Sequence, residues 1–292
     1  ALHKVTLESE LRQAIHAGDL VLHFQPKVLL RTGQIIGFEA LIRWNHPNRG
    51  LVAPIDFIPV AEESELILEI GRFTLRESIR QLAAWRKAAL VSPCTTMAVN
   101  LSAKQFTDRH LVENVMQKLS THNLPPACLE LEVTEGVLIH NAPAALELLK
   151  QLKAIGVSLA LDDFGTGYSS LSYLKQFPFD SLKIDRSFIA DIETDEQTAA
   201  ITESIVALGR ALKLHTVAEG IETMEQSARV QALGCRYAQG YLFSRALPAE
   251  EMLRLLQAEA LIASPAPSYC PYSSTRRGQS LSLCDPQREE AR

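Results

Sequence analysis

The 292-residue sequence lacks the features that mark several large classes of protein. It has no run of 18 apolar residues, so no membrane-spanning helix is expected. Lysine and arginine number 29 against 34 acidic residues, a formal net charge of −5, which argues against a protein that binds duplex nucleic acid. The five cysteines form no CxxC pair, so they are expected to be reduced thiols and not a disulfide framework or a zinc site. A phosphate-bearing ligand would therefore need local cations or metal ions.

Short apolar segments alternate with amphipathic segments along most of the chain. This alternation is typical of a parallel sheet with helical crossovers. Strands are predicted at 21–30, 34–44, 95–102, 128–135, 157–163, 181–185, 215–220 and 237–243. Helices are predicted near 6–17, 56–65, 67–89, 108–121, 142–155, 169–176, 196–213, 222–233 and 248–260. The fold class is therefore α/β, a (β/α)₈ TIM-like barrel in which an N-terminal hairpin contributes one antiparallel strand.

The pattern stops near the end of the chain. From residue 263 the sequence is rich in serine, proline and arginine and has few large apolar residues. Such a segment cannot bury enough apolar surface to offset the entropy lost on ordering. We expect the barrel to occupy residues 1–262 and residues 263–292 to form a disordered tail.

Most predicted strands end in a carboxylate, an amide or a lysine. The residues concerned are Glu39, Asn100, Glu132, Glu135, Asp162, Asp163, Lys183, Asp185, Glu219 and Gln239. In a (β/α)₈ barrel the carboxyl ends of the strands open onto one mouth, where the chemistry takes place. Carboxylates gathered there repel one another, and Mg²⁺ or Mn²⁺ would compensate them because these ions prefer oxygen ligands. The pattern predicts a metal-dependent enzyme, although a single strand-end acid is more often a helix cap or a turn residue.

The adjacent pair Asp162 and Asp163 opens the segment DDFGTGYSS. One carboxylate of such a pair can bridge two metal ions while its neighbour binds the second. Two ions about 3.5–4 Å apart can stabilise an in-line displacement at phosphorus. The glycines of this segment favour a lid or a metal-positioning loop, whereas a GxG sequence alone is weak evidence for a phosphate-binding loop.

Several of these segments, in order, resemble the EAL-domain phosphodiesterases that hydrolyse cyclic di-GMP. Glu39-Ala40-Leu41, followed by Ile42 and Arg43, resembles the motif that gives the family its name. Further likeness lies in FQP at 24–26, VNLS at 99–102, LEVTE at 131–135, DDFGTGYSS at 162–170, LKID at 182–185, AEGIET at 218–223 and QGY at 239–241. The resemblance covers residues 7–258. It implies hydrolysis of cyclic di-GMP to linear pGpG by a two-metal mechanism, which lowers a bacterial second messenger.

The resemblance also implies roles for individual residues. The metal ligands would be Glu39, Asn100, Glu132, Asp162, Asp163 and Glu219. The catalytic residues would be Lys183, Glu219 and Glu39, with Lys183 orienting the attacking water. The substrate-binding residues would be Gln25, Arg43 and Gln239. Glu135 would anchor the loop that begins at Asp162. Two ions, Mg²⁺ or Mn²⁺, would be the cofactors, with no organic cofactor.

Alternatives to this reading remain. Some members of the family have lost these residues and only bind the nucleotide, so a catalytically inactive cyclic di-GMP receptor is the main alternative. An unrelated Mg²⁺-dependent barrel enzyme acting on a small carboxylate is a third. The first helix resembles the connector that follows a diguanylate cyclase domain, so we expect a longer parent protein with upstream sensory or cyclase domains. Homodimer formation is left open, and the expected location is the cytoplasm or the cytoplasmic face of a membrane-tethered parent.

Overall fold

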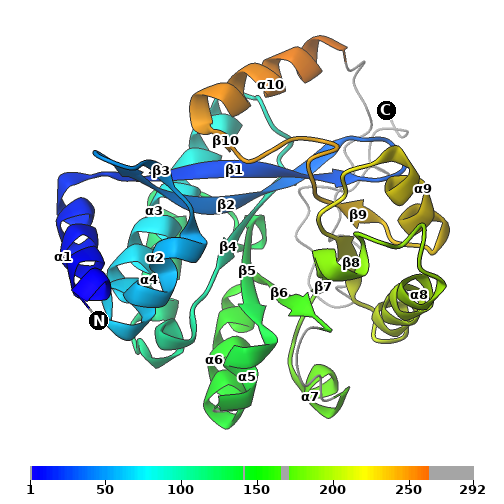
Figure 1. Cartoon of the computed structure of the whole chain (residues 1–292), viewed down its shortest axis with the longest axis horizontal. Helices are drawn as coiled ribbons and strands as arrows, with labels where there is room; N and C mark the ends of the chain where they lie inside the picture. Colours follow the sequence, from blue (N-terminus) through cyan, green and yellow to red (C-terminus); the bar gives the residue numbers. More distant parts are fainter. Residues whose placement is uncertain (1, 141, 166–170, 263–292) are drawn as a thin grey trace, which may run out of the picture.

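A closed barrel of eight strands forms the centre of the molecule (Figure 1). The structure is a computed structural model that describes residues 2–140, 142–165 and 171–262, so the predicted tail lies outside the described residues. The barrel strands are β1 (Leu20–Leu29), β2 (Ile35–His46), β4 (Thr96–Asn100), β5 (Leu129–Thr134), β6 (Ser158–Phe164), β7 (Ser181–Ile184), β8 (His215–Ala218) and β9 (Tyr237–Ala238). They pair in that order, and β9 pairs with β1 to close the barrel.

One strand of the barrel runs against the others. The strands from β2 to β9 pair in parallel, whereas β1 is antiparallel to both β2 and β9. The cause is local, because a short turn returns the chain from β1 into β2 and pairs Leu20 with Trp44 at the far end of the hairpin. The predicted barrel with one antiparallel strand is confirmed.

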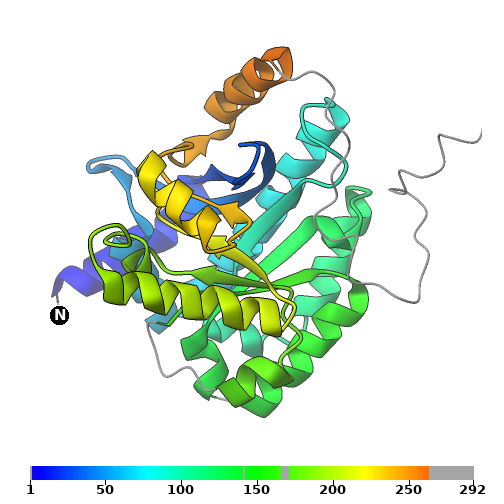
Figure 2. The same cartoon turned by 90° about the vertical axis from the view of Figure 1, so that its right-hand side faces the viewer.

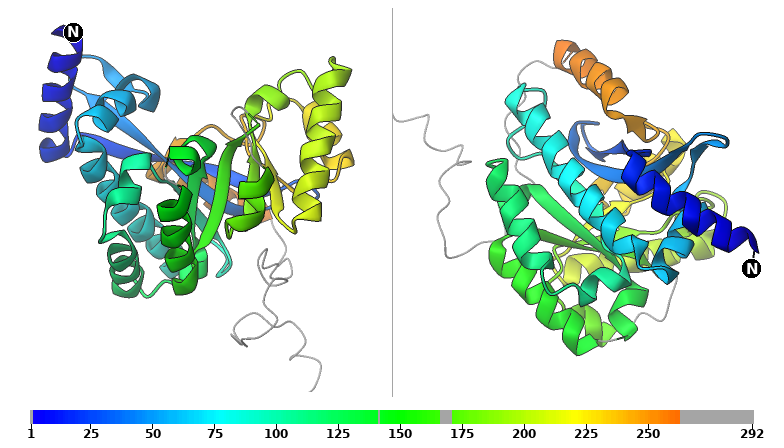
Figure 3. Two further views of the ribbon diagram at one scale, coloured as in Figure 1. Left: turned by 90° about the horizontal axis from the view of Figure 1, so that it is seen from below. Right: turned by 90° about the vertical axis from the view of Figure 1, so that its left-hand side faces the viewer.

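Helices cover the outside of the barrel (Figures 2 and 3). They are α1 (Leu2–Ala17), α2 (Pro54–Glu63), α3 (Leu66–Lys87), α4 (Leu111–Thr121), α5 (Glu135–His140), α6 (Ala142–Ile155), α7 (Leu171–Gln176), α8 (Glu196–Ala211), α9 (Met224–Ala232) and α10 (Ala249–Ile262). Two short strands, β3 (Gly50–Val52) and β10 (Leu247–Pro248), pair with β2 and β1. None of the described helices is long and apolar enough to span a bilayer.

Packing of α3 determines which side chains of β1 and β2 face into the barrel. Trp85 of α3 packs against Phe24 and Phe38, with ring centroids 5.0 and 4.9 Å apart. Side chains alternate between the two faces of a strand. Because Phe24 and Phe38 point outward to α3, their neighbours Gln25 and Glu39 point inward.

Two of the differences between the predicted and the observed strand boundaries concern the site. The strand predicted at 128–135 ends at Thr134, and Glu135 is the first residue of α5. The strand predicted at 237–243 is reduced to Tyr237–Ala238, because the following residues bond to the loop after β8: Ile221 donates its N–H to Gln239 and accepts from Leu242. Gly240 lies so close to Ile221 that an added Cβ would meet its backbone oxygen at 2.1 Å. This close approach ends the strand.

Candidate active site

A buried lysine lies at the centre of the carboxylates at the barrel mouth. Lys183 of β7 is 1% exposed. Its Nζ lies 2.7 Å from Glu132 Oε2, 2.7 Å from Glu219 Oε1, 3.1 Å from Asp162 Oδ1 and 3.6 Å from Glu39 Oε2. These residues belong to β2, β5 and β6 and to the residue after β8, so the fold brings together side chains that are far apart in sequence.

Two amides fix the carboxylate of Glu39. Asn100 donates from Nδ2 to Glu39 Oε1 at 2.8 Å, and Gln239 donates from Nε2 to Glu39 Oε2 at 2.6 Å. Gln239 also donates to Gln25 Oε1 at 3.0 Å. Burial acts to raise the pKa of Glu39, but Lys183 and the two amides outweigh it and hold the pKa below its usual value. Glu39 is therefore ionised and held in one orientation.

A bulge turns both aspartates of the DD pair toward the mouth. Consecutive side chains of a regular strand point to opposite faces. The pairing of β6 with β7 shifts register between Leu161 and Phe164, and Asp163 has a φ of 54°, in the left-handed region that aspartate tolerates. Oxygens of Asp162, Asp163 and Glu219 consequently lie within 4.8 Å of one another.

The donor set at the mouth fits divalent metal ions. Five carboxylates gather at the mouth around the ammonium of Lys183, those of Glu39, Glu132, Asp162, Asp163 and Glu219. Burial, with Asp162 and Glu39 adding to it and Lys183 opposing it, raises the pKa of Glu219 to about 8. Burial and the charge of Glu39 likewise raise the pKa of Glu132 well above its usual value. This excess of buried negative charge is what a bound cation would neutralise, and carboxylate and amide oxygens are the ligands that Mg²⁺ and Mn²⁺ prefer.

These shifts predict how the metal-free chain responds to pH. Between pH 4.5 and about 8 the unfolded chain has lost the proton of Glu219 while the folded chain still holds it. The folded state then binds more protons, so the contribution of Glu219 to stability is fully present below pH 4.5 and is lost as the pH rises to about 8. In a chelating buffer, the melting temperature of the wild-type chain relative to that of Glu219→Gln should therefore fall across this interval. Parallel melting curves for the two proteins would contradict the prediction.

Arg43 lies farther out on β2. By strand alternation it shares a face with Glu39 and Leu41, and it is half-buried. Its Nη1 donates to the carbonyl of Ile42 at 2.8 Å, which holds the guanidinium close to the strand. Gln25, which accepts from Gln239, donates in turn to the carbonyl of Ser244 at 3.1 Å. The residues predicted to bind substrate thus line the β1, β2 and β9 side of the mouth.

Glu135 contacts the segment that begins at Asp162, although not from a strand. As the first residue of α5, it accepts on Oε1 from the backbone N–H of Gly165 at 3.2 Å. The rest of the predicted loop beyond Gly165, residues 166–170, lies outside the described residues. The contact with Gly165 ties α5 to the chain directly after the paired aspartates.

Glu135→Ala should lower turnover by about 10–100-fold, because this carboxylate supports the backbone that carries two predicted metal ligands. Excess Mg²⁺ should restore part of the loss. Kinetics across a Mg²⁺ titration measure both effects, with Glu147→Ala, an exposed residue of α6, as the matched control. Wild-type parameters throughout would leave Glu135 as a helix-terminal residue only.

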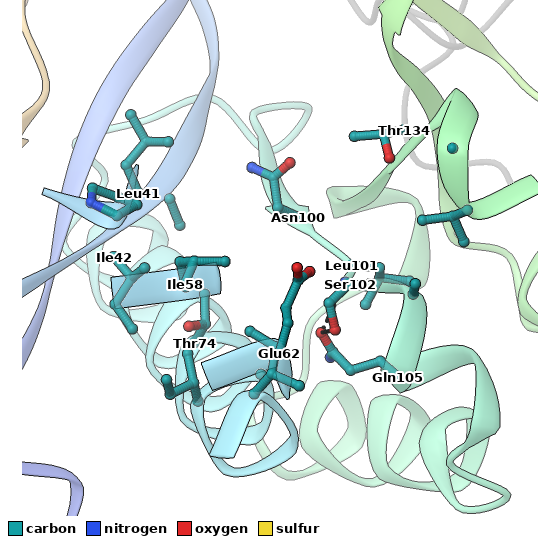
Figure 4. A pocket seen from close by; sticks show the side chains of 18 residues that line it. Leu41, Ile42, Ile58, Glu62, Thr74, Asn100, Leu101, Ser102, Gln105 and Thr134 are labelled. Carbon is teal, nitrogen blue, oxygen red and sulfur yellow. Dashed lines mark hydrogen bonds between the residues drawn. The ribbon is translucent and has the colours of Figure 1, made fainter. Parts of the chain in front are cut away.

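A cavity of about 440 Å³ lies next to Asn100, the residue that donates to Glu39 (Figure 4). Its walls are mainly apolar and include Leu41 and Ile58. The carboxylate of Glu62 points into it (Figure 4). The strand-end pattern of the sequence does not point to Glu62, because this residue lies on α2 and not at a strand end. A planar base could lie between the apolar walls and hydrogen-bond to Glu62.

A second polar group lies deeper in the barrel and was also missed from the sequence. It consists of Lys27, Glu130 and Ser181, all buried. Each of these three residues lies two positions from a residue of the mouth, Gln25, Glu132 and Lys183 respectively. Because residues two apart in a strand share a face, this spacing could have indicated the buried group.

Comparisons with known proteins agree with this geometry. The family model described as EAL domain matches residues 8–246. MucR of Pseudomonas aeruginosa, named a bifunctional diguanylate cyclase/cyclic di-GMP phosphodiesterase, is 48% identical over 253 residues, which are 87% of this chain and 37% of MucR. PdeR of Escherichia coli, named a cyclic di-GMP phosphodiesterase, is 40% identical over 243 residues, 83% of this chain and 36% of PdeR.

A solved structure of the PaMucR phosphodiesterase in complex with c-di-GMP has a TM-score of 0.81 and 48% identity, and the match covers 85% of this chain and 99% of that one. This chain spans 37% and 36% of the lengths of MucR and PdeR, about a third of each curated relative. The family model nevertheless matches most of the sequence, from within α1 to the residues after the last barrel strand. The chain belongs to the EAL domain family.

Proposed function

We propose that this chain hydrolyses one phosphodiester bond of cyclic di-GMP to give linear pGpG, with Mg²⁺ or Mn²⁺ as cofactor. The observation that carries the proposal is the cluster at the mouth, in which four carboxylates lie within 3.6 Å of Lys183 Nζ. The names of MucR and PdeR and the c-di-GMP complex of PaMucR support the choice of substrate.

The metal ions would be held by Glu39, Asn100, Glu132, Asp162, Asp163 and Glu219. When bound, such ions supply Lewis-acid chemistry, because they stabilise negative charge on the phosphoryl oxygens and on the departing sugar oxygen. The amides of Asn100 and Gln239 keep Glu39 in place before the substrate arrives. Preorganisation of this kind avoids the cost of moving charged groups during the reaction.

Lys183 and Glu219 would act on the attacking water. The water oxygen forms a bond to phosphorus while the bond from phosphorus to the sugar oxygen breaks, so one proton must leave the water and one must reach the leaving oxygen. Lys183 would orient the water and offset the charge that develops. Its partner Glu219, 2.7 Å away, would accept the proton of the water on its carboxylate, and a solvent water would supply the proton that the leaving oxygen takes up.

The substrate would lie across the mouth. Arg43 would bind a phosphate through its guanidinium, and Gln25 and Gln239 would contact the substrate next to Glu39. One guanine base would occupy the cavity that contains Glu62, whose volume of about 440 Å³ is within the usual range for small-molecule sites.

The greater length of MucR and PdeR supports a further part of the proposal, that this chain is the phosphodiesterase part of a longer signalling protein. Upstream sensory or cyclase domains, homodimer formation and a cytoplasmic location stay predictions.

Incubation of the purified chain with cyclic di-GMP and Mg²⁺, followed by chromatography, tests the proposal. We expect pGpG to accumulate well beyond one equivalent per protein chain. Stoichiometric binding of cyclic di-GMP without pGpG would contradict hydrolysis and favour the receptor alternative.

A further inference from the structure

A layer of three buried polar side chains lies directly beneath the carboxylates of the mouth. Lys27 of β1 is 2% exposed, and Glu130 of β5 and Ser181 of β7 are both 0% exposed. Glu130 and Ser181 each precede a mouth residue by two positions, Glu132 and Lys183, and so point into the barrel on the same face. The interior layers of such barrels are usually filled by branched apolar residues.

The contacts of this layer lead to one residue of the mouth. Lys27 Nζ forms an ion pair with Glu130 Oε1, and Glu130 Oε2 accepts from Ser181 Oγ at 3.2 Å. The same Nζ lies 3.8 Å from Glu132 Oε1, while Glu132 Oε2 lies 2.7 Å from Lys183 Nζ. Glu132 therefore lies between two ammonium groups, with one of its oxygens facing each.

Stability alone gives no reason for this arrangement. Taking two charges out of water costs free energy that their attraction often fails to recover. Replacing a buried ion pair with uncharged residues of similar volume is often neutral or stabilising, whereas removing one partner is strongly destabilising. The ion pair with Glu130 therefore does not by itself explain why Lys27 is present, because two uncharged residues could fill the same space without loss of stability.

We propose that Lys27 is a positioning residue for Glu132, which it holds in the orientation required for metal binding. The assignment rests on the proposed function, since it takes Glu132 to be a metal ligand. Glu130 and Ser181 hold the ammonium of Lys27 beneath Glu132. Attraction to Lys27 keeps Glu132 Oε1 pointing down the barrel and thereby leaves Oε2 at the level of Lys183 and the other carboxylates.

The double variant Lys27→Met/Glu130→Gln separates orientation from charge. It removes one positive and one negative group, so the net charge of the barrel interior is unchanged, and the glutamine keeps an oxygen for Ser181. Calorimetric titration of the substrate-free chain with Mn²⁺ measures metal affinity without any reference to turnover. We expect the Kd for Mn²⁺ to rise by about 10–100-fold, the usual effect of losing a group that orients a metal ligand. Turnover at saturating Mn²⁺ should largely recover.

Two further variants complete the experiment. Ser181→Ala is a smaller change that keeps the inference testable if the double variant does not fold, and it should raise the Kd for Mn²⁺ in the same direction. Lys153→Met is the matched control, because Lys153 forms an ion pair with Asp180 at the opposite end of the barrel. It should alter the melting temperature without altering the Kd.

The outcomes distinguish the two proposals. Wild-type affinity for Mn²⁺ in a folded double variant, or in Ser181→Ala if the double variant does not fold, would overturn the role of Lys27 and leave the proposed function standing. Failure of the wild-type chain to bind Mn²⁺ would overturn the metal-dependent function and the role of Lys27 together.

Discussion

Turnover of cyclic di-GMP is expected to stop in excess EDTA and to return when Mg²⁺ or Mn²⁺ is added beyond the chelator. The reason is the excess of carboxylates around Lys183, which alone cannot neutralise them. Without a cation, burial raises the pKa values of Glu132 and Glu219, and the value of about 8 for Glu219 means that this predicted ligand holds its proton at neutral pH. Chelation should thus remove the Lewis acid and also change the protonation of Glu219, one of the residues proposed to bind it.

Ca²⁺ provides the second half of this experiment. It takes longer bonds and more ligands than Mg²⁺, so it should bind at the same carboxylates and suppress turnover. The melting temperature measured with each ion reports whether that ion binds. A rise in melting temperature with Ca²⁺ but no turnover would show that Ca²⁺ binds without supporting hydrolysis. Full turnover in excess EDTA would falsify the metal-dependent mechanism.

Glu39→Gln should lower turnover by more than about 100-fold, since loss of a residue that merely orients a metal ligand already costs about 10–100-fold. Both oxygens of Glu39 accept hydrogen bonds, from Asn100 and Gln239. A glutamine offers one oxygen only, so its NH₂ group would face one of these donors and the amide network around it would rearrange. The variant loses a charge and a fixed orientation at once, with almost no change in volume.

Chromatographic measurement of pGpG under saturating Mg²⁺ checks the effect, and circular dichroism checks that the barrel is intact. Glu113→Gln serves as control, because Glu113 is a glutamate of α4 whose side chain is 81% exposed. The same chemical change there should leave turnover unaltered. A folded Glu39→Gln variant with wild-type turnover would show that Glu39 is not a metal ligand.

The convergence of Glu39, Glu132, Asp162, Lys183 and Glu219 could be predicted from the sequence because it depends on fold class alone. Once strands and helices alternate in a closed barrel, every strand end opens onto the same mouth. Hydrophobic periodicity is enough to find the strands. A polar residue at the end of each apolar segment is then a candidate for a side chain at the barrel mouth.

Features that depend on pairing between strands could not be predicted in this way. The left-handed backbone at Asp163 arises where β6 and β7 shift register, and no local pattern near Asp163 marks that shift. The helical start at Glu135 was missed because LEVTE is a regular strand pattern up to its last residue. Lys27 was read as part of an apolar strand, since its partner Glu130 is 103 residues away.

The antiparallel β1 has a consequence for how the chain folds during synthesis. Its pairing with β2 is local and can form as soon as the hairpin leaves the ribosome, but its pairing with β9 joins Val28 to Ala238. Contacts so distant in sequence form late, because the entropy of closing the intervening loop must be lost first. The hydrogen bonds from Gln239 to Gln25 and Glu39 belong to this last closure. A chain that is still being translated therefore carries the EAL motif before the contacts of Gln239 with Gln25 and Glu39 can form, and the proposed hydrolysis would begin only after β9 has been added.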